Sequence, residues 1–298
     1  MYIGRRGRQF VEERETKKMA DEGKATERGG LSNLQSFLDA ATPSVPAHQL
    51  PEGGDGAQFF YLEEFWEQYN EPSAYGLDVP VYLQIGEVSQ YFVPSLSALQ
   101  IYTRKAPLAA ASRGDEVANP SSDDVAEDDI GQLYIEFFER TLPHARRPLV
   151  DKIAELAETY PELNSFKSTE LSRASWISVA WYPIYHIPST RNVKGFATCF
   201  LTYHALSSFS KDVIHGSTTS EAPSSGTTSE MKPEEGSFIS LPPFGLATYK
   251  LQRQGSLWTM PGSGDSERLG SLFMAADSWL KQLKVRHHDF IYFSSHFM

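Results

Sequence analysis

The sequence predicts an α+β fold in which a mostly antiparallel β-sheet is covered by helices. Some segments carry apolar residues at the three-to-four-residue spacing of a helix, and others alternate apolar and polar residues as strands do. Helical segments do not separate each pair of predicted strands, and this order favours antiparallel pairing over parallel crossovers. The 298 residues, of which 40% are hydrophobic, are enough for a sizeable core.

Three polar stretches interrupt these patterned segments. Residues 1–30 form a charged tail, and the stretches at about 103–129 and 207–236 are rich in Ser and acidic residues. Their few apolar side chains cannot offset the entropy that ordering would cost, so all three are expected to be disordered. Strongly patterned segments flank both internal stretches. We therefore interpret these two as flexible insertions in a single domain over residues 31–298.

Five apolar stripes at helical spacing predict helices. In the first, Leu34, Phe37 and Leu38 share one face, Ser32 with Gln35 fits a capping box, and a proline ends the run. Such stripes usually face a core and carry no chemistry of their own. The remaining stripes consist of Leu62, Phe65, Trp66 and Tyr69; of Ile130, Leu133, Tyr134, Phe137 and Phe138; of Ile153, Leu156, Ala157 and Tyr160; and of Leu269, Leu272, Phe273, Ala276, Trp279, Leu280 and Leu283.

Residues that alternate in polarity predict strands between the helices. The segment from 90 to 102 is expected to form two short strands broken at Pro94, because proline cannot donate to a sheet ladder. Aromatic residues on both sides of the strand that begins at Ile177 predict a core on each face of the sheet, and this strand is expected to pair with the next one as a hairpin. The expected strands lie at 79–85, 90–102, 177–182, 196–205 and 246–251.

Several stretches together resemble a known family. They are SNLQSFLDAATPSVPA, SAYGLDVPVYL, QYFVPSLSALQIY, SWISVAWYPIYHIPS, GFATCFLTYHAL, LPPFGLATYKLQ and SWLKQLKVRHHDFIYFSSH, which follow one another between about Leu31 and His296. In this set the chain resembles the plant family known as domain of unknown function family 789. The resemblance implies a plant source, an intracellular protein and no settled activity. It therefore transfers no catalytic residue to this sequence.

Composition narrows the class of partner and the compartment. The net charge of −11 and the pI of about 5.2 exclude a broad surface for nucleic acid, so small molecules or proteins are the expected partners, and proteins are favoured. Cys199 is the single cysteine, which rules out an intrachain disulfide and suits a reducing compartment. No run of about 18 apolar residues occurs, and the N-terminal sequence lacks the apolar stretch of a signal peptide. We expect an intracellular protein, cytoplasmic or nuclear, with no membrane span.

Motifs for metal, cofactor or nucleophilic chemistry are missing. The histidines and the cysteine do not have the spacing of metal ligands, so neither a metal nor a cofactor is expected. The GxSxG motif does not occur, and Ser294, Ser295 and His296 fall in a segment that we interpret as a strand, where neighbours face opposite sides. The stretch PGSGDS lacks the lysine of a P-loop. We interpret it as a loop that ends in a helix N-cap at Asp265 or Ser266.

Two classes of function remain open. The first is a noncatalytic protein-interaction or regulatory module, which needs no motif and presents flexible loops to partners. Ser121, Thr218 and Thr227 each have an acidic residue three positions later, a layout that suits acidophilic kinases, so they are candidate phosphorylation sites. The second is a small-molecule-binding protein or hydrolase-like enzyme with a Tyr- and His-lined pocket. Its candidate ligand-binding residues are Tyr185, His186, Arg191, Lys194, Tyr249 and His287.

Overall fold

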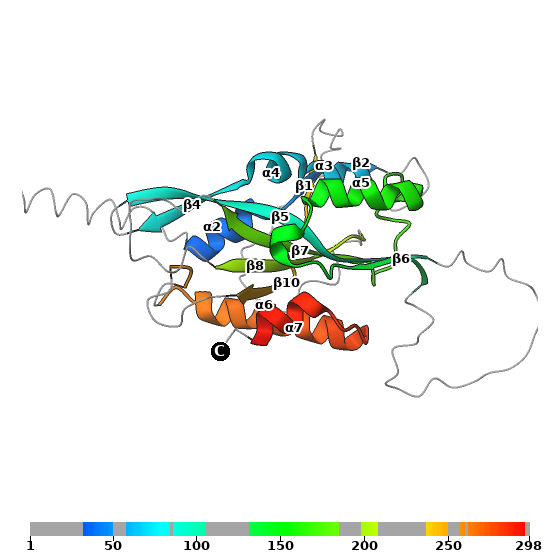
Figure 1. Ribbon diagram of the computed structural model, residues 1–298. Coiled ribbons are helices and arrows are strands. Elements are labelled where there is room, and N and C mark those ends of the chain that lie inside the picture. The colour runs from blue at the N-terminus through cyan, green and yellow to red at the C-terminus, as the bar shows by residue number, and fades with distance from the viewer. Residues whose placement is uncertain are drawn as a thin grey trace, which may run out of the picture.

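Six strands form one antiparallel sheet at the centre of the molecule (Figure 1). The strand order is β10-β8-β7-β5-β4, and β6 pairs with β5 beyond the end of β4. This sheet, flanked by helices, confirms the predicted α+β class. The computed structural model describes residues 32–49, 58–83, 86–104, 131–184, 198–207, 237–249, 257–259 and 262–295. The strands of the sheet are Leu77–Leu83 (β4), Gly86–Thr103 (β5), Gln132–Phe138 (β6), Trp176–Ile184 (β7), Cys199–Ala205 (β8) and Gly245–Tyr249 (β10).

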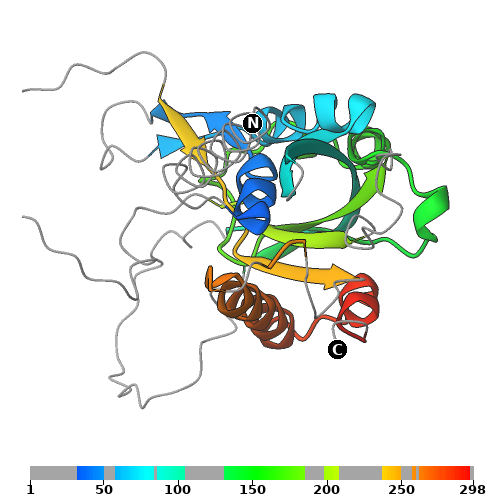
Figure 2. The ribbon, with the colours of Figure 1, turned by 90° about the vertical axis from the view of Figure 1, so that its left-hand side faces the viewer.

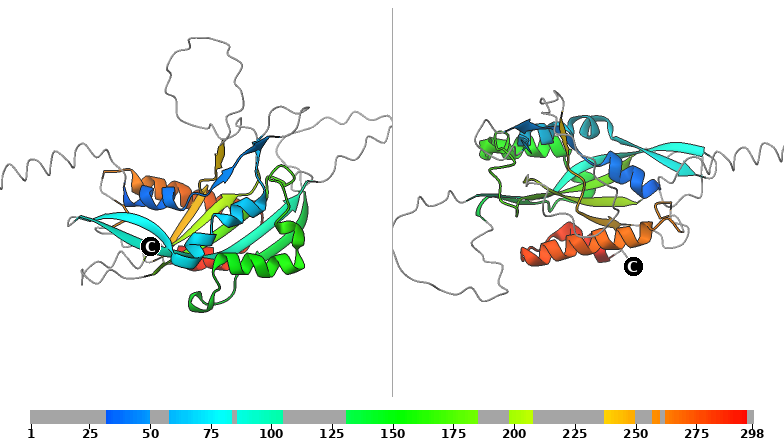
Figure 3. Two further views of the ribbon diagram at one scale, coloured as in Figure 1. Left: turned by 90° about the horizontal axis from the view of Figure 1, so that it is seen from above. Right: turned by 180° about the vertical axis from the view of Figure 1, so that it is seen from behind.

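Helices cover both faces of the sheet, as the sequence predicts. The curled sheet has α3, α4 and α5 on one side and α6 and α7 on the other (Figures 1, 2 and 3). We call these sides the α3–α5 face and the α6–α7 face. Among the described helices, none combines the length and the apolar character needed to cross a membrane. The α-helices are Asn33–Ala40 (α2), Leu62–Glu67 (α3), Asn70–Tyr75 (α4), Leu149–Thr159 (α5), Asp265–Gln282 (α6) and His288–Ser295 (α7).

Shorter elements complete the description. The 3-10 turn η2 lies in the connection between β6 and α5, and η3 follows α5. Two small antiparallel pairs lie outside the main sheet, β1 with β9 and β2 with β3. These elements are Pro143–Ala145 (η2), Pro161–Leu163 (η3), Ser44–Pro46 (β1), Phe238–Ser240 (β9), His48–Gln49 (β2) and Gln58–Phe59 (β3).

The core on the α3–α5 face is built around aromatic rings. Phe37 of α2 is fully buried and stacks on Phe200 of β8, with the ring centroids 3.9 Å apart. Phe92, Trp181 and Trp258 surround the same ring with edge-on contacts between 5.5 and 6.3 Å. Large rings bury much apolar surface at a small cost in side-chain entropy. This cluster therefore contributes strongly to the packing energy on this face.

A second, smaller core lies on the α6–α7 face. Trp176 and Ala180 of β7 and Tyr203 of β8 contribute to it, together with Ala276 of α6. The helix packs so closely on the sheet that a Cβ added at Gly245 of β10 would lie 2.8 Å from the Cβ of Ala276. The prediction that the strand after Ser175 has two buried faces is confirmed, and so is its antiparallel pairing with the following strand.

The predicted helix over 130–138 is wrong, because residues Gln132–Phe138 form strand β6. Ile135 of β6 pairs with Ile101 of β5, and the register shifts between Ile101 and Tyr102. The apolar residues of this segment fit a helical stripe, but they are mostly aromatic and β-branched, which also suits a strand. The free edge of β5 beyond β4 offers backbone partners, and this pairing decides the structure.

The predicted break at Pro94 is also wrong, because β5 continues through it. On one side β5 pairs with β4 as far as Phe92 and with β6 only from Ala98. Pro94 lies in the gap between these two partners, where the loss of an N–H donor is tolerated. On the other side β5 pairs with β7, and the register shifts between Leu96 and Ala98. This bulge leaves Ser97 as an extra residue in the strand.

The N-terminal caps of α2 and α6 agree only in part with the caps that the sequence predicts. Ser32 caps α2 as predicted, since its Oγ accepts from the backbone N–H of Gln35 at 3.1 Å. The side chain of Gln35 donates to Asp39 instead of completing the capping box. The N-cap of α6 is Gly264, with φ of 76°, whereas the sequence predicts Asp265 or the next residue. Glycine adopts this left-handed conformation without steric cost.

The segment around Ser294 is helical, so its predicted assignment as a strand is wrong. It belongs to α7, where Phe290 and Phe293 are buried and Ile291 and Tyr292 are about half exposed. The three-residue spacing of the two buried rings is that of one helix face. A run of apolar residues as short as this one does not distinguish strand from helix, and docking on the sheet selects the helix.

Candidate functional site

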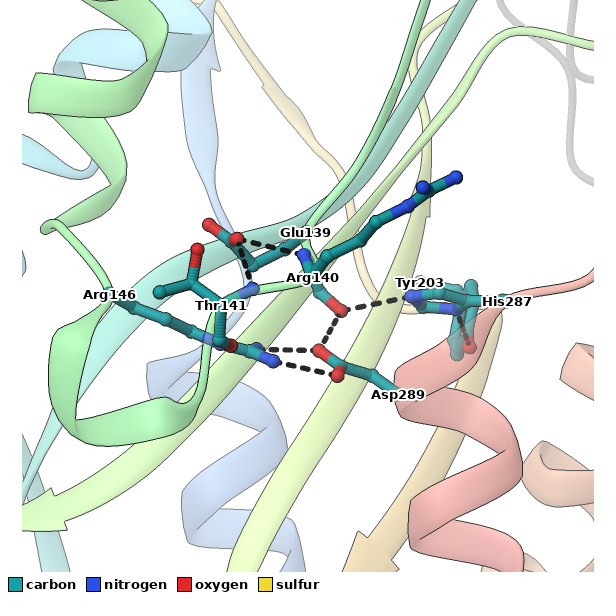
Figure 4. A network of polar contacts seen from close by, with 8 residues as sticks. Glu139, Arg140, Thr141, Arg146, Tyr203, His287 and Asp289 are labelled. Atoms are coloured by element: carbon teal, nitrogen blue, oxygen red, sulfur yellow. Dashed lines mark hydrogen bonds and ion pairs between the residues drawn. The ribbon is translucent and has the colours of Figure 1, made fainter.

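A group of buried polar side chains lies between the sheet and α7 (Figure 4). Ser97 comes from the bulge of β5, Tyr203 from β8 and Arg146 from the loop before α5. His287 directly precedes α7, and Asp289 lies in its first turn. Only 5% of the Arg146 side chain and 10% of the Asp289 side chain are exposed, and the other three residues are buried. Four distant segments therefore meet in one cluster, which we call the Ser97 network.

The hydrogen bonds of the Ser97 network determine where each proton lies. The hydroxyl of Ser97 donates to Asp289 Oδ2 at 2.5 Å, and the oxygen of that hydroxyl, Ser97 Oγ, lies 2.9 Å from His287 Nε2. Because a serine has one hydroxyl hydrogen, its oxygen accepts the hydrogen of His287 Nε2. His287 Nδ1 is then the acceptor for the hydroxyl of Tyr203, at 2.8 Å. Donation therefore runs in one direction, from Tyr203 through His287 and Ser97 to Asp289.

Burial keeps the uncharged members of this network neutral. It lowers the pKa of His287 to about 4, although the charge of Asp289 acts in the opposite direction. Burial also raises the pKa of the Tyr203 hydroxyl well above its ordinary value. A neutral imidazole and a protonated phenol are the forms that the direction of the hydrogen bonds requires.

Arg146 and Asp289 form the charged end of the network. Arg146 Nη1 donates to Asp289 Oδ2 at 2.6 Å and Nη2 donates to Oδ1 at 2.8 Å, a bidentate pair. Burial lowers the pKa of Arg146, but the hydrogen bond and the charge of Asp289 outweigh it, so the pKa is raised overall. The guanidinium also lies 5.7 Å from the ring centroid of Tyr182. Each ion is therefore compensated inside the protein.

The same arginine holds the loop that follows β6. Arg146 Nε donates to the carbonyl of Thr141 at 2.9 Å. The buried carboxylate of Glu139 accepts from the backbone N–H groups of Arg140 and Thr141, both at 2.8 Å. Residues 140–147, which we call the Arg140 loop, are largely exposed. These contacts hold the exposed loop in one conformation from its buried side.

The Ser97 network contains a serine, a histidine and an aspartate, but it is not a catalytic triad. In a triad, the imidazole takes the serine proton and its other nitrogen donates to the carboxylate. Here the serine proton goes to Asp289, and the other nitrogen of His287 accepts from Tyr203. Ser97 is also fully buried, so no substrate can reach its hydroxyl without a rearrangement. This geometry favours a structural role.

The described residues include two of the predicted ligand-binding residues, which do not meet. His287 is buried in the Ser97 network, whereas the Tyr249 hydroxyl accepts a hydrogen bond from Tyr292 of α7 at 3.2 Å. Tyr249 lies opposite Cys199, four positions along β8 from Tyr203, a separation of ~13 Å. The remaining candidates lie outside the described residues, namely Tyr185, His186, Arg191 and Lys194 for ligand binding and Ser121, Thr218 and Thr227 for phosphorylation.

A second buried histidine lies on the α3–α5 face. The Nδ1 atom of His204 lies 2.9 Å from the carbonyl of Leu241, which can only accept, so Nδ1 carries the hydrogen. Its Nε2 atom lies 3.0 Å from Thr202 Oγ1, which in turn accepts from the indole N–H of Trp181 at 3.0 Å. Burial lowers the pKa of His204 to about 4. This histidine is neutral and is hydrogen-bonded entirely by the core.

The part of the chain that the structure describes lacks a metal site and has a surface depression along α5. Within those ranges, no group of three or more His, Cys, Asp or Glu side chains is placed to hold a metal ion. Cys199 is buried on the α6–α7 face. A surface depression of about 500 Å³ lies along α5, and Arg147 is the single residue of the Ser97 network or the Arg140 loop in its lining. Its lining consists of Arg147, Asp151, Ala154, Glu155 and Glu158.

His287 is a candidate from the sequence alone, whereas none of its partners is. Ser97, Arg146 and Asp289 come from segments that no spacing in the sequence connects. One signal was available, since Asp289 stands directly before an apolar run, and a carboxylate buried by such a run requires a cation. Nothing in the sequence indicates which of the 27 basic residues provides it.

Comparisons with known proteins agree with the resemblance found in the sequence. No curated protein and no solved structure matches the chain. A family model described as "Protein of unknown function (DUF789)" matches residues 32–129 and 108–293. These two ranges include every residue of the Ser97 network and of the Arg140 loop. The chain therefore belongs to the DUF789 family of proteins of unknown function.

Proposed function

We propose that this protein is a noncatalytic protein-interaction module that binds an acidic segment of a partner through the Arg140 loop. One observation supports the proposal above all others, namely that an exposed loop rests on a buried, hydrogen-bonded support. A surface already held in its binding conformation loses less entropy when a partner docks. The Ser97 network provides such a support and places no reactive group at the surface.

The side chains of the Arg140 loop suit an acidic partner. Leu142 is 65% exposed, and Arg140, His144 and Arg147 are exposed on either side of it. Arg147 is paired with Glu155 at 3.2 Å, but the side chains of Arg140 and His144 make no hydrogen bond or ion pair with any other described residue. Arginine is frequent in interface hot spots, because its planar guanidinium pairs with carboxylates in a defined geometry. Leu142, an apolar side chain between basic ones, is the anchor of this surface, although the chain as a whole has a net charge of −11.

Regulation by phosphorylation belongs to the same proposal. Ser121, Thr218 and Thr227 are each followed at the third position by an acidic residue, which supports modification by an acidophilic kinase. A cytoplasmic or nuclear location in a plant cell is also part of the proposal, and the family resemblance and the single cysteine support it. Phosphopeptide mapping of the chain from plant cells tests the sites, and unmodified peptides under all conditions would remove this part of the proposal.

Site-specific photo-crosslinking tests the binding surface. A photoreactive residue is placed at Leu142 of the full chain in plant cells, and a matched control carries it at Tyr75 of α4, which is 76% exposed. We expect a partner to be captured from position 142 and not from position 75. Arg140→Glu should reduce this capture about tenfold, because it puts a like charge against an acidic partner.

The captured partner is then purified, and its affinity for the isolated chain is measured with and without Arg140→Glu. Since the Arg140 side chain is exposed, the variant should keep the melting temperature of the wild type. Equal capture from positions 142 and 75, or an affinity that Arg140→Glu leaves unchanged, would show that the Arg140 loop is not the binding surface.

A further inference from the structure

Three rings and a lysine gather on one small surface beside α3. His48 of β2 pairs with Phe59 of β3, and Tyr61 forms an antiparallel bridge with Lys167. Side chains that are paired across antiparallel strands lie on the same face, and so do residues two positions apart on one strand. These rules place all four side chains together, and the ring distances agree.

Phe59 and Tyr61 form the two walls of a corner. Their ring centroids are 5.4 Å apart and their planes meet at 78°. The imidazole of His48 lies 5.4 Å from the first ring and 5.1 Å from the second. Lys167 Nζ lies 5.3 Å from the centroid of Phe59 and 6.0 Å from that of Tyr61. The ammonium is therefore within cation–π distance of both walls.

The ammonium of Lys167 has no other partner among the described residues. No hydrogen bond and no ion pair joins its Nζ to them, although its backbone N–H donates to Glu170 at 2.8 Å. Lys152 shows the ordinary arrangement, because its Nζ lies 5.7 Å from the ring of Phe137 and is also paired with Glu155 at 2.8 Å. Within the described structure, the contacts of the Lys167 ammonium are to ring faces alone.

We propose that the corner of His48, Phe59 and Tyr61 binds a methylated ammonium group and that Lys167 occupies it when no ligand is present. Ring faces attract a cation without using its N–H groups, so methylation removes no hydrogen bond from the complex. A methylated ammonium is also less strongly hydrated than a primary one, and it therefore loses less on entering an aromatic site. This proposal is independent of the Arg140 loop.

A carboxylate adds negative charge beside the corner. Glu64 Oε1 lies 2.7 Å from His48 Nε2, and Glu64 Oε2 accepts from the backbone N–H of Tyr61 at 2.9 Å. The carboxylate is therefore fixed near two of the rings, and 21% of the Glu64 side chain is exposed. Rings combined with a carboxylate favour a cation over a neutral group of the same shape.

Choline is the first probe, titrated into the full chain while the aromatic NMR signals of Phe59 and Tyr61 are followed. In Lys167→Ala the internal occupant is removed, so choline should bind about two- to fivefold more tightly than in the wild type. Lys152→Ala is the matched control, since it also removes a lysine from an aromatic ring, and it should leave the affinity unchanged. Lys167→Gln provides a second variant if the alanine variant does not fold.

Two further measurements distinguish a site that selects cations from a purely apolar site. The neutral analogue 3,3-dimethylbutan-1-ol should bind more weakly than choline, and Tyr61→Leu in the Lys167→Ala background should weaken choline binding about two- to fivefold. Equal binding of the two probes, or an affinity for choline that neither Lys167 variant raises, would overturn the proposal. If a peptide with trimethylated lysine binds more tightly than choline, the natural ligand is a protein tail. If choline binds more tightly than the peptide, the natural ligand is a free quaternary amine.

Discussion

The two faces of the sheet are closed by different kinds of interaction, although both are buried. On the α3–α5 face, Phe37 packs among other aromatic rings. On the α6–α7 face, a directed chain of hydrogen bonds ends in the pair of Arg146 and Asp289. Apolar packing stabilises roughly in proportion to the buried area, whereas a buried polar network stabilises only when every member has its partner.

This difference separates stability from specificity. The aromatic core can accept other apolar side chains of similar volume with a modest loss. The Ser97 network instead determines how β5, β8, the Arg140 loop and α7 lie relative to one another. Each of its hydrogen bonds forms only when the donor and the acceptor have one relative position. The two buried histidines show the same contrast, because His204 is bonded within the core and His287 is linked to an ion pair.

Phe37→Ala should have the largest effect on stability. It removes a fully buried ring and leaves a cavity among the surrounding rings, which should cost ~4 kcal/mol of unfolding free energy. Urea denaturation, followed through the tryptophan fluorescence to which Trp181 and Trp258 contribute, measures it. Phe37→Met keeps more of the volume and should cost ~1.5 kcal/mol or less. Equal losses in the two variants would contradict the view that ring packing dominates this face.

Asp289→Ala should cost ~3 kcal/mol, because it leaves Arg146 without its partner. This is the lower end of the range for a buried pair, since Arg146 belongs to a loop beside solvent. The double variant Arg146→Met with Asp289→Leu should lose less than Asp289→Ala alone, because no charge then remains buried. Denaturation of Arg146→Met, of Asp289→Leu and of the double variant gives the coupling energy. Losses that simply add would show that the two side chains are not coupled.

Acid should destabilise the protein through His204 and His287, the two histidines that are buried among the described residues. Their pKa values in the folded protein are about 4, below the ordinary value of 6.5, so the unfolded chain binds more protons. The stability is fully present above pH 6.5 and is lost as the pH falls toward 4, by ~2 kcal/mol per histidine at pH 5. His204→Gln and His287→Gln should each reduce the difference in unfolding free energy between pH 7 and pH 5 by this amount. An unchanged difference would mean that the replaced histidine is protonated in the folded state.

Tyr203→Phe should have the smallest effect that is still measurable. It removes the donor to His287 Nδ1 and should cost ~1 kcal/mol, because the buried nitrogen is left without a partner. Tyr249→Phe is the matched control, because the Tyr249 hydroxyl is hydrogen-bonded to the Tyr292 hydroxyl at an exposed site. This variant should change the unfolding free energy by ~0.5 kcal/mol or less. If both variants lose the same amount, the Tyr203 hydroxyl contributes nothing beyond its packing.

The candidate site could be predicted from the sequence only in fragments. The alternation at β7 and β8 and the stripes of α2, α5 and α6 were sufficient to locate those elements. The errors at β6 and α7 occur where a short apolar run suits both helix and strand, and there the neighbouring element decided. Ser97 enters the site through a bulge that arises from the pairing of β5 with β7, and a single sequence does not reveal such a mismatch of register.

By itself the sequence determined the α+β class, the two buried faces of the sheet and the family. Helical spacing and strand alternation are local consequences of backbone geometry, so they can be read along the chain. The tertiary structure alone decided that Ser97, Arg146 and Asp289 meet beneath an exposed loop and that Lys167 lies over two ring faces. These contacts join segments far apart in the chain, and their geometry depends on strand register and helix docking, which no local pattern encodes.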